Sequence, residues 1–249
     1  MATALTLPDE TCEPFAQGRL RLLQKRRGYR FSLDAVLLAG LVNLSGRESV
    51  IELGTGCGII SLLLARRYPD LKLTAVELQP RLADLARRNV ILNDLSDQIT
   101  ILEADMAALS RIFPAGAFAV CISNPPYRPL TSGRLNPDPE KAVARHEVKG
   151  SLATVVQAAA HLLPTGGRLA LIYPAWRLAH LLITLRTRHL EPKKLLCVHS
   201  RPGEAAKLVY VEARHGGREE LKILPPLVIY REDGRYTPEL EQLLTLPSW

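Results

Sequence analysis

The stretch SVIELGTGCGII (residues 49–60) decides the fold of this chain. The apolar run at 49–53 favours a buried strand, and the apolar run from Ile59 to about Tyr68 favours a helix. Glycines at positions 54, 56 and 58 let the intervening backbone turn tightly and approach a ligand closely. A glycine loop between a strand and a helix is typical of an open α/β sheet, which binds ligands at the carboxyl ends of its strands.

Alternating strands and helices flank this stretch. We predict further strands at 71–78, 98–105, 117–123 and 168–173, and helices at 32–44, 80–92, 151–163 and 176–189. Apolar runs at 190–200 and 205–214 are joined by a short link at 201–204, which predicts an antiparallel pair. Together these elements predict an α/β fold: a doubly wound, mostly parallel, seven-stranded Rossmann-like sheet with one antiparallel strand near its C-terminal edge.

The chain is predicted to divide near residue 30. Residues 1–30 would form an N-terminal tail and basic segment, and residues 31–249 the α/β domain. Residues 1–14 are polar and contain prolines, which favours a loose tail. The basic segment from Arg19 to Arg30 is predicted to form a short hairpin.

The composition is that of a folded protein with reduced cysteines. Of 249 residues, 47% are hydrophobic and 23% are charged, which argues against disorder, and the net charge of +7 suits a polyanionic partner. The four cysteines lack CxxC spacing, and the N-terminus lacks the features of a signal peptide. No apolar run approaches the ~20 residues of a membrane span. We therefore predict a soluble cytoplasmic protein with no membrane partner and no metal, and leave its oligomeric state open.

The tetrapeptide Asn124-Pro125-Pro126-Tyr127 follows the predicted strand at 117–123. Asn-Pro disfavours helical backbone and the prolines have no N–H to donate, so the strand must end in a stiff, extended turn. Such a turn can aim the Asn124 amide oxygen and a proline carbonyl at one planar amine, with the Tyr127 ring beside it. Two converging acceptors would hold both hydrogens of an exocyclic NH2 and leave its lone pair facing an electrophile. An isolated NPPY is equally compatible with a proline-rich surface turn.

Acidic residues accompany the preceding strands. Glu52 belongs to the glycine-loop motif, Glu77 ends the second strand, and Asp105 ends the third. Glu77 lies 23 residues after Gly54, where an acidic side chain can accept hydrogen bonds from both hydroxyls of a ribose. Asp105 could contact an adenine amino group. Each feature alone is more often structural, and the glycine loop with Glu77 would also suit NAD. Together, however, the glycine loop, Glu77, Asp105 and the NPPY turn follow four successive strands in order, and this combination is much more specific than any one of them.

The motifs ELGTGCG (52–58), AVEL (75–78), EAD (103–105) and SNPPY (123–127) resemble those of class I S-adenosylmethionine-dependent methyltransferases, over roughly residues 28–175. Within that class, NPPY marks enzymes that methylate a planar nitrogen: adenine N6, cytosine N4, guanine N2 or a glutamine amide. The resemblance implies S-adenosylmethionine as the cofactor.

The same resemblance implies roles for individual residues. The cofactor would be bound by Glu77 on its ribose, by Asp105 on its adenine, and by the loop around its methionine part, comprising Glu52, Gly54, Gly56 and Gly58. Asn124 and Pro125 would hold the target amine, with Pro126 completing the turn and Tyr127 stacking on a flipped base. Asn124 is also predicted to be one of the cofactor-binding residues. The histidines are scattered without metal-ligand spacing, and only His146 stands close enough to the motif to be of interest.

Segments outside these motifs resemble one particular family within this class of methyltransferases. RRGYRFSLD (26–34), ARHE (144–147) and RPGEAAKLVYVEARHGG (201–217) are similar to the bacterial tRNA adenine-N6 methyltransferases that modify adenine 37 beside the anticodon of valine tRNA. This resemblance implies that Ser32 and Asp34 line the methyl-donor pocket. A helix cap and a first-turn acid would explain these two residues equally well.

The predicted partner is tRNA. Phosphate neutralisation supplies most of the affinity for nucleic acid, and basic residues flank the motifs on both sides. The candidate RNA-binding residues are Arg26, Arg27, Arg30, Arg128 and Arg145. Any one of them could equally be a solvated charge, so the prediction concerns the set.

Three hypotheses follow, and the first is a tRNA adenine-N6 methyltransferase. The second is an amino-methyltransferase of rRNA or of a protein glutamine. Glutamine methyltransferases with this motif carry a helical domain before the glycine loop, for which the 53 residues here leave little room. The third is a non-catalytic RNA-binding module, against which the intact NPPY and glycine loop argue.

Overall fold

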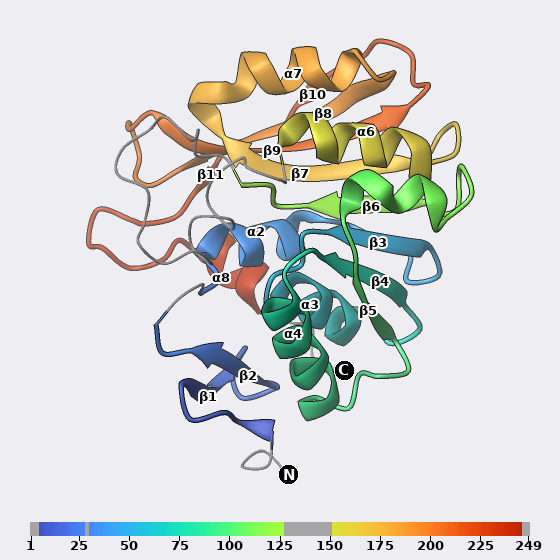
Figure 1. Ribbon diagram of the computed structural model, residues 1–249. Coiled ribbons are helices and arrows are strands. Elements are labelled where there is room, and N and C mark those ends of the chain that lie inside the picture. The colour runs from blue at the N-terminus through green and yellow to red at the C-terminus, as the bar shows by residue number, and fades with distance from the viewer. Residues whose placement is uncertain (1–4, 28–29, 127–150, 246–249) are drawn as a thin grey trace.

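The computed structural model describes residues 5–27, 30–126 and 151–245. Its centre is a sheet in which the strands have the spatial order β10-β8-β9-β7-β6-β3-β4-β5, with β11 also paired to β8 (Figure 1). Every pair in it is parallel except those that β9 makes with β7 and β8. The long strands are β3 (Ser49–Leu53), β4 (Lys72–Glu77), β5 (Ile99–Glu103), β6 (Val120–Ser123), β7 (Arg168–Pro174), β8 (Leu190–His199) and β9 (Ala206–His215).

The predicted doubly wound, mostly parallel sheet is confirmed, as is its antiparallel strand, β9. The predicted strand number of seven is wrong, because the described residues alone form a sheet of nine strands. The additions are β10 (Lys222–Ile223) and β11 (Leu227–Val228), both of which pair with β8. Two-residue strands on either side of Pro225-Pro226 are too short to show the alternation by which a strand is predicted.

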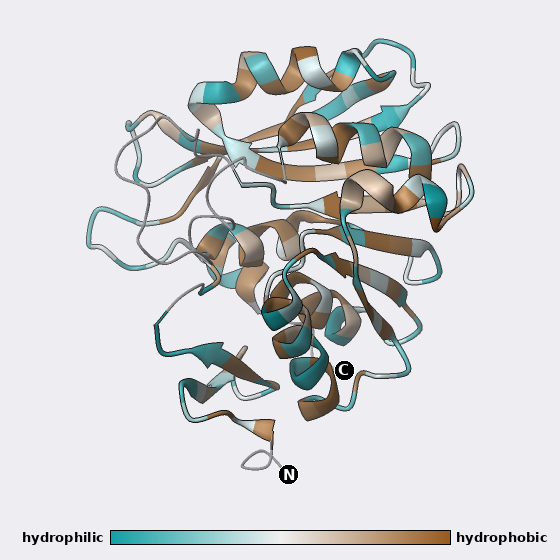
Figure 2. Ribbon diagram, in the orientation of Figure 1, coloured by the Kyte–Doolittle hydropathy of each residue, from teal (hydrophilic) through white to brown (hydrophobic). Residues whose placement is uncertain are grey.

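Helices cover both faces of the sheet (Figure 1). One face carries α2 (Leu33–Leu41), α3 (Ile59–Arg67), α4 (Pro80–Leu92) and α8 (Pro238–Leu244); the other carries the 3₁₀ helix η1 (Met106–Arg111), α6 (Leu152–Leu162) and α7 (Leu178–Arg186), and a 3₁₀ turn η2 (Ala175–Arg177) links β7 to α7. Figure 2 shows hydrophobic strands between these layers. Because the central strands are buried on both faces, their sequences are continuously apolar.

The N-terminal segment forms a hairpin of β1 (Glu10–Phe15) and β2 (Leu20–Lys25) outside the main sheet. The predicted loose tail over residues 1–14 is therefore wrong for residues 10–14, and the hairpin begins earlier than the predicted basic segment. The physical reason is a partner distant in sequence. Glu10 is buried, and both of its carboxylate oxygens accept hydrogen bonds from Arg88 on α4, at 2.6 and 2.7 Å. Burial alone would raise the pKa of Glu10, but the guanidinium and the Leu7 N–H lower it.

Buried asparagines on α4 hold the hairpin to the domain. The Asn89 Oδ1 accepts a hydrogen bond from the Leu23 N–H at 2.7 Å, and its Nδ2 donates to the Leu23 and Cys57 carbonyls at 3.0 and 2.9 Å. Asn93 makes the same exchange with the backbone of Arg21, at 2.8 and 2.7 Å. Asn89 thus links the hairpin to the glycine loop, since Cys57 belongs to that loop. The division into residues 1–30 and 31–249 stays a prediction.

We expect Asn89→Ala to lower the free energy of unfolding by about 3 kcal/mol, because it leaves one N–H and two carbonyls buried without their partner. Urea denaturation measures this. The matched control is Arg87→Ala on the same helix, whose half-exposed ion pair with Glu103 at 3.5 Å should contribute less than about 1 kcal/mol. Equal effects of the two substitutions would contradict the role given to Asn89.

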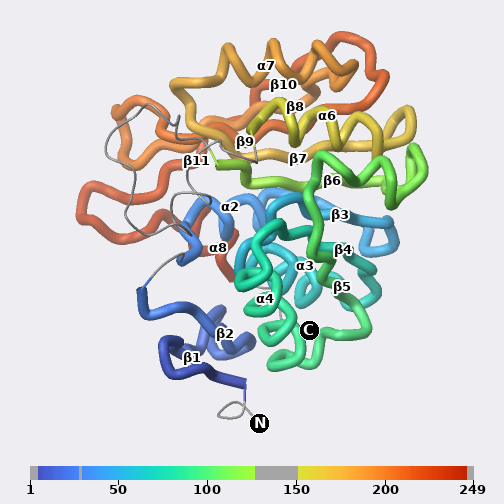
Figure 3. The backbone as a smooth tube through the Cα atoms, viewed as in Figure 1, coloured from blue at the N-terminus to red at the C-terminus, as the bar shows by residue number. Residues whose placement is uncertain are grey.

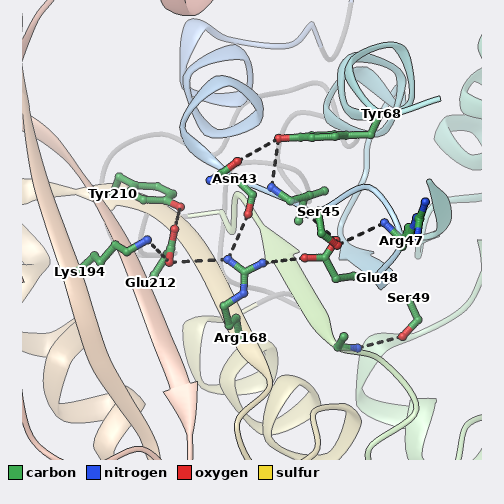
Figure 4. Close-up of polar contacts among 12 residues, drawn as sticks. Asn43, Ser45, Arg47, Glu48, Ser49, Tyr68, Arg168, Lys194, Tyr210 and Glu212 are labelled. Atoms are coloured by element: carbon green, nitrogen blue, oxygen red, sulfur yellow. Dashed lines mark hydrogen bonds and ion pairs between the residues drawn. The ribbon is translucent and has the colours of Figure 1, made fainter. Parts of the chain in front are cut away.

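A polar network ties the antiparallel strand to the rest of the sheet at the amino end of β7 (Figure 4). Glu212 on β9 accepts a hydrogen bond from the Tyr210 hydroxyl at 2.6 Å and lies 3.9 Å from Arg168, the first residue of β7. Arg168 also donates to Glu48 at 3.2 Å and to the Asn43 carbonyl at 3.1 Å. The network lies at the edge opposite the carboxyl ends of the parallel strands, so it stabilises the sheet away from the ligand-binding edge.

Helix α8 closes the face that carries α2. Its N-cap is Thr237, whose hydroxyl accepts a hydrogen bond from the Leu240 N–H at 3.3 Å. Leu243 packs so tightly on α2 that a Cβ at Gly40 would come within 2.6 Å of its Cγ. Gly40 is therefore needed for this close helix approach.

Candidate active site

The carboxyl ends of β3, β4 and β6 bring three predicted site residues together. β3 ends in register with Val76 of β4 and Ser123 of β6. The next residues along the three strands are Gly54, Glu77 and Asn124, so they stand level at one edge of the sheet. The tube in Figure 3 shows the chain leaving all three strands on the same side. This is the edge at which open α/β sheets bind ligands.

The glycine loop has the left-handed backbone that its sequence predicts. The φ angles of Gly54, Gly56 and Gly58 are 79°, 59° and 89°, and Gly58 is the N-cap of α3. The N–H groups of Gly54 and Thr55 both donate to the Val76 carbonyl at 2.9 Å, which holds the loop against β4. A side chain at any of the three glycines would strain the loop, because L residues rarely adopt these positive φ angles.

Glu77 faces the loop from the end of β4. Its Oε2 accepts a hydrogen bond from the Gly56 N–H and its Oε1 from the Gln79 N–H, both at 2.9 Å. Burial raises the pKa of Glu77, and the N–H groups of Gln79 and Gly56 partly offset that. Each carboxylate oxygen can accept a second hydrogen bond, so two further donors fit this group.

Glu52 lies beneath the loop and is fully buried. Its Oε2 accepts hydrogen bonds from the Thr55 hydroxyl at 2.8 Å and from the Ser61 hydroxyl. Its Oε1 is buried and has no hydrogen-bond partner in the described part of the chain. Desolvation is the main cause that raises the pKa of Glu52 to about 7, and the two hydroxyls partly oppose it. Glu52 therefore braces the loop, and its second oxygen can accept one more donor.

The raised pKa of Glu52 predicts a pH dependence of stability. Between about pH 4.5 and 7 the folded chain keeps the Glu52 proton that the unfolded chain has lost, so its contribution to stability falls as pH rises and levels off above 7. In Glu52→Gln this fall is absent. We expect the free energy of unfolding of the variant, relative to wild type, to increase by up to about 3 kcal/mol between pH 5 and pH 8, as measured by urea denaturation.

Glu48→Gln is the matched control. Burial alone would raise the pKa of Glu48, but hydrogen bonds from Ser45 lower it below the ordinary value. A lowered carboxyl pKa contributes stability that is lost only as the pH falls below about 4.5, so this variant should differ from wild type by a constant amount between pH 5 and pH 8. A constant difference for Glu52→Gln as well would contradict the assignment.

Asp105 follows β5 and begins η1. Its side chain accepts a hydrogen bond from the Ala107 N–H at 2.9 Å, so it is the N-cap of that short helix. Asp105 is only partly buried. The Ala104 N–H donates to the Glu77 carbonyl at 3.0 Å, which ties the end of β5 to the end of β4. Asp105 thus lies at the same sheet edge as Glu77, one strand further out.

The turn after β6 is fixed through its neighbours. The Ser123 hydroxyl donates to the Leu53 carbonyl at 2.8 Å inside the core, which locks β6 to β3 at the last residue before the turn. Asn124 is half-buried and Pro125 is buried. Tyr127 lies outside the described residues, as do Arg128, Arg145 and His146, so their predicted roles remain predictions.

Other predicted residues precede the glycine loop. Ser32 stands at the N-cap of α2 without a side-chain capping bond, and Asp34 is in the first turn of that helix. Arg26 and Arg27 are exposed, and Arg30 forms an exposed ion pair with Glu13 at 3.4 Å.

The site fits S-adenosylmethionine. The orphaned Oε1 of Glu52 can accept one more donor, such as an amine or a water. Gly54 is exposed, and a ligand can therefore approach its backbone. The remaining acceptor positions of Glu77 suit the two hydroxyls of a ribose. No cluster of three or more metal-ligating side chains occurs among the described residues. None of the described helices is long and apolar enough to span a membrane.

Comparison with known proteins agrees with this geometry. Residues 33–179 match the model of the methyltransferase small domain family. The chain belongs to this family. S-adenosylmethionine is accordingly the cofactor, and the roles predicted for the loop, Glu77 and Glu52 in binding it stay predictions.

Three curated relatives of this methyltransferase carry the name tRNA1(Val) (adenine(37)-N6)-methyltransferase. The relative from Porphyromonas gingivalis is 30% identical over 92% of each chain. The one from Aeromonas hydrophila is 27% identical over 88% of the methyltransferase and 89% of the relative. The one from Trichodesmium erythraeum is 34% identical over 64% and 66%.

Several solved structures with this fold are described as methyltransferases. A protein from Agrobacterium tumefaciens, described as a predicted O-methyltransferase, has a TM-score of 0.70 and 26% identity, over 85% of this chain and 95% of its own. Geranyl diphosphate C-methyltransferase from Streptomyces coelicolor has a TM-score of 0.50 and 14% identity, over 74% and 79%, which shows a shared fold alone.

The sequence analysis missed the partners that shape the site. Thr55 and Ser61 hold Glu52, and the Gln79 N–H holds Glu77. Ser61 did carry a signal, because it is a polar residue in an otherwise apolar helix start. The Gln79 contact is made by backbone and leaves no trace in residue type.

Proposed function

We propose that this methyltransferase transfers a methyl group from S-adenosylmethionine to N6 of an adenine in tRNA, at adenine 37 of a valine tRNA. The observation that carries the proposal is the register that sets Asn124 and Pro125 beside Gly54 and level with Glu77. A turn that holds an exocyclic amine thereby adjoins the loop that holds the cofactor. The shared name of the relatives supports tRNA as the substrate.

The main task of the protein in this reaction is to align the target amine with the methyl group of the cofactor. When bound, S-adenosylmethionine supplies a methyl group already activated by its positive sulfur. Asn124 Oδ1 and the Pro125 carbonyl accept the two amine hydrogens, which turns the nitrogen lone pair towards that methyl group. As the new N–C bond forms, the methyl–sulfur bond would break and its electron pair would stay on sulfur, which leaves as a neutral thioether. The nitrogen would then be cationic and lose its extra proton to solvent. The two acceptors also disfavour an oxygen nucleophile, which has fewer hydrogens to donate.

The same proposal gives the basic residues their role. Arg26, Arg27 and Arg30 are exposed and belong to the stretch of sequence between β2 and α2. They would neutralise phosphates of the tRNA, together with Arg128 and Arg145. The hairpin segment would then act as an RNA-contacting addition to the catalytic domain. A tRNA substrate also supports a cytoplasmic location, in line with four free cysteines.

Methylation of defined transcripts tests the proposed position. We expect N6-methyladenosine in an unmodified valine tRNA transcript and none in the same transcript with guanine at position 37. Equal methylation of both transcripts would contradict the position, and a 2′-O-methyl product would contradict the target atom and favour the O-methyltransferase description of the Agrobacterium structure.

A further inference from the structure

Trp176 is a large aromatic side chain left in solvent beside the candidate active site. It is 73% exposed, whereas Tyr173 and Tyr210 are fully buried. It lies in η2, directly after β7. Isolated exposed apolar residues are common on protein surfaces, so exposure alone carries no inference. The inference comes from the position of Trp176 in the fold and from its contact with Arg177.

β7 is the strand next to the NPPY turn. Leu171 pairs in parallel with Ser123, so the end of β7 lies beside the residues that begin the turn. The chain therefore leaves β7 at the same edge of the sheet as it leaves β6 (Figure 1). Contacts of η2 with β9 and α7 hold it at that edge. Trp176 thus stands on the side from which a substrate must reach Asn124.

Arg177 orders the aromatic surface. Its guanidinium carbon lies 5.4 Å from the centroid of the Tyr173 ring and 5.7 Å from that of Trp176. The buried tyrosine anchors the guanidinium, and the guanidinium in turn positions the indole through a cation–π contact. An indole held in this way keeps most of its surface in solvent and has a positive charge at its side.

We propose that Trp176 and Arg177 form a nucleotide-stacking subsite, in which an unpaired RNA base next to the target adenine stacks on Trp176 and its phosphate is neutralised by Arg177. The proposal rests on the proposed function and names a substrate contact that none of the site motifs supplies. An aromatic face beside a positive charge is the surface that single-stranded RNA recognises, because every base has a π face and every nucleotide a phosphate. An anticodon loop offers unpaired bases on both sides of position 37.

The first test follows the indole directly. The chain has only two tryptophans, so Trp249→Phe leaves Trp176 as its sole tryptophan. In this variant we expect an unmodified valine tRNA transcript to quench the emission of Trp176 and to protect it from acrylamide. Emission and acrylamide access that stay unchanged, while filter binding shows the protein saturated with tRNA, would overturn the subsite.

The second test separates stacking from charge. We expect Trp176→Ala to raise the KM for tRNA about tenfold, with kcat, affinity for S-adenosylmethionine and the urea midpoint unchanged, and Trp176→Phe to recover most of the loss. The tenfold rise in KM caused by Trp176→Ala should be the same at low and high salt, because stacking involves no charge. Arg177→Ala removes a charge and should therefore make tRNA binding less dependent on salt. Ile183→Ala on α7 is the matched control, since Ile183 is 65% exposed and should leave the KM unchanged.

The outcomes distinguish this subsite from the proposed function. If Trp176→Ala behaves like Ile183→Ala while wild type methylates tRNA, the subsite is wrong and the function stands. If wild type methylates a protein and does not bind tRNA, both are wrong, and Trp176 then marks a protein-docking surface. A loss of kcat without change in KM would assign Trp176 to the catalytic step and overturn the stacking role.

Discussion

Replacing Asn124 by alanine is expected to lower turnover by two to three orders of magnitude, roughly what the loss of one preorganised polar group costs at other active sites. The affinity for S-adenosylmethionine should change less than about twofold. The reason is positional. Asn124 follows Ser123, whose hydroxyl locks β6 to β3, so the side chain is held at the sheet edge by the strand and not by the cofactor. Its loss removes an acceptor for the target amine alone.

Single-turnover methylation at saturating tRNA measures the first quantity, and calorimetric titration with S-adenosylmethionine measures the second. Asn43→Ala is a suitable control, because Asn43 is an exposed asparagine beyond the end of α2 and belongs to the network at the opposite edge of the sheet. A parallel loss of cofactor affinity in Asn124→Ala would show that Asn124 serves the cofactor and would contradict its assignment to the substrate.

Replacing Glu77 by alanine is expected to do the reverse and weaken the binding of S-adenosylmethionine at least about a hundredfold. Two effects combine. The variant loses the acceptors for two ribose hydroxyls, and it releases the Gly56 and Gln79 N–H groups that the carboxylate fixes at 2.9 Å. At saturating cofactor, turnover should recover to within about tenfold of wild type, because the amine acceptors remain in place.

Glu103→Ala is the matched control for Glu77. Glu103 pairs with Glu77 across β4 and β5 but is exposed, and its partner is Arg87 at 3.5 Å. Cofactor affinity should therefore be unchanged in Glu103→Ala, as titration of the two variants side by side would show. Equal weakening in both would point to a general electrostatic effect of the acidic strand ends instead of a specific contact.

Much of the fold could be predicted from the sequence because most of its elements are buried on both sides. The predicted strand at 49–53 and helix at 80–92 agree with β3 and α4 to the residue. Continuous apolar runs bounded by glycine or proline define such elements without reference to the rest of the chain. The short link at 201–204 likewise sufficed to predict the antiparallel pairing of β8 and β9.

The elements that were missed depend on partners distant in sequence. β1 contains the polar residues Glu10, Thr11 and Glu13, and Glu10 is held by Arg88 on α4, 78 positions away. The partner strand β2 is held by Asn89 on the same helix, 66 positions from Leu23. The two-residue strands β10 and β11 exist only because β8 has a free edge to which they can add. Local patterns carry no information on such pairings.

In the candidate active site, too, some features could be predicted from the sequence and others could not. Glycine spacing and the acids at strand ends could be predicted, since the strand ends of a parallel sheet must meet at one edge. The double role of Glu77 could not, because its partners are backbone N–H groups. Nor could the unusual pKa of Glu52, which arises from complete burial between the sheet and α3.

The most direct test is transfer of labelled methyl from S-adenosylmethionine into unmodified total tRNA, followed by digestion to nucleosides and mass analysis. The proposed function predicts N6-methyladenosine in the wild-type reaction and almost none with Asn124→Ala. Label that appears in rRNA or in a protein glutamine, with none in tRNA, would contradict the proposed substrate while leaving the methyltransferase family intact.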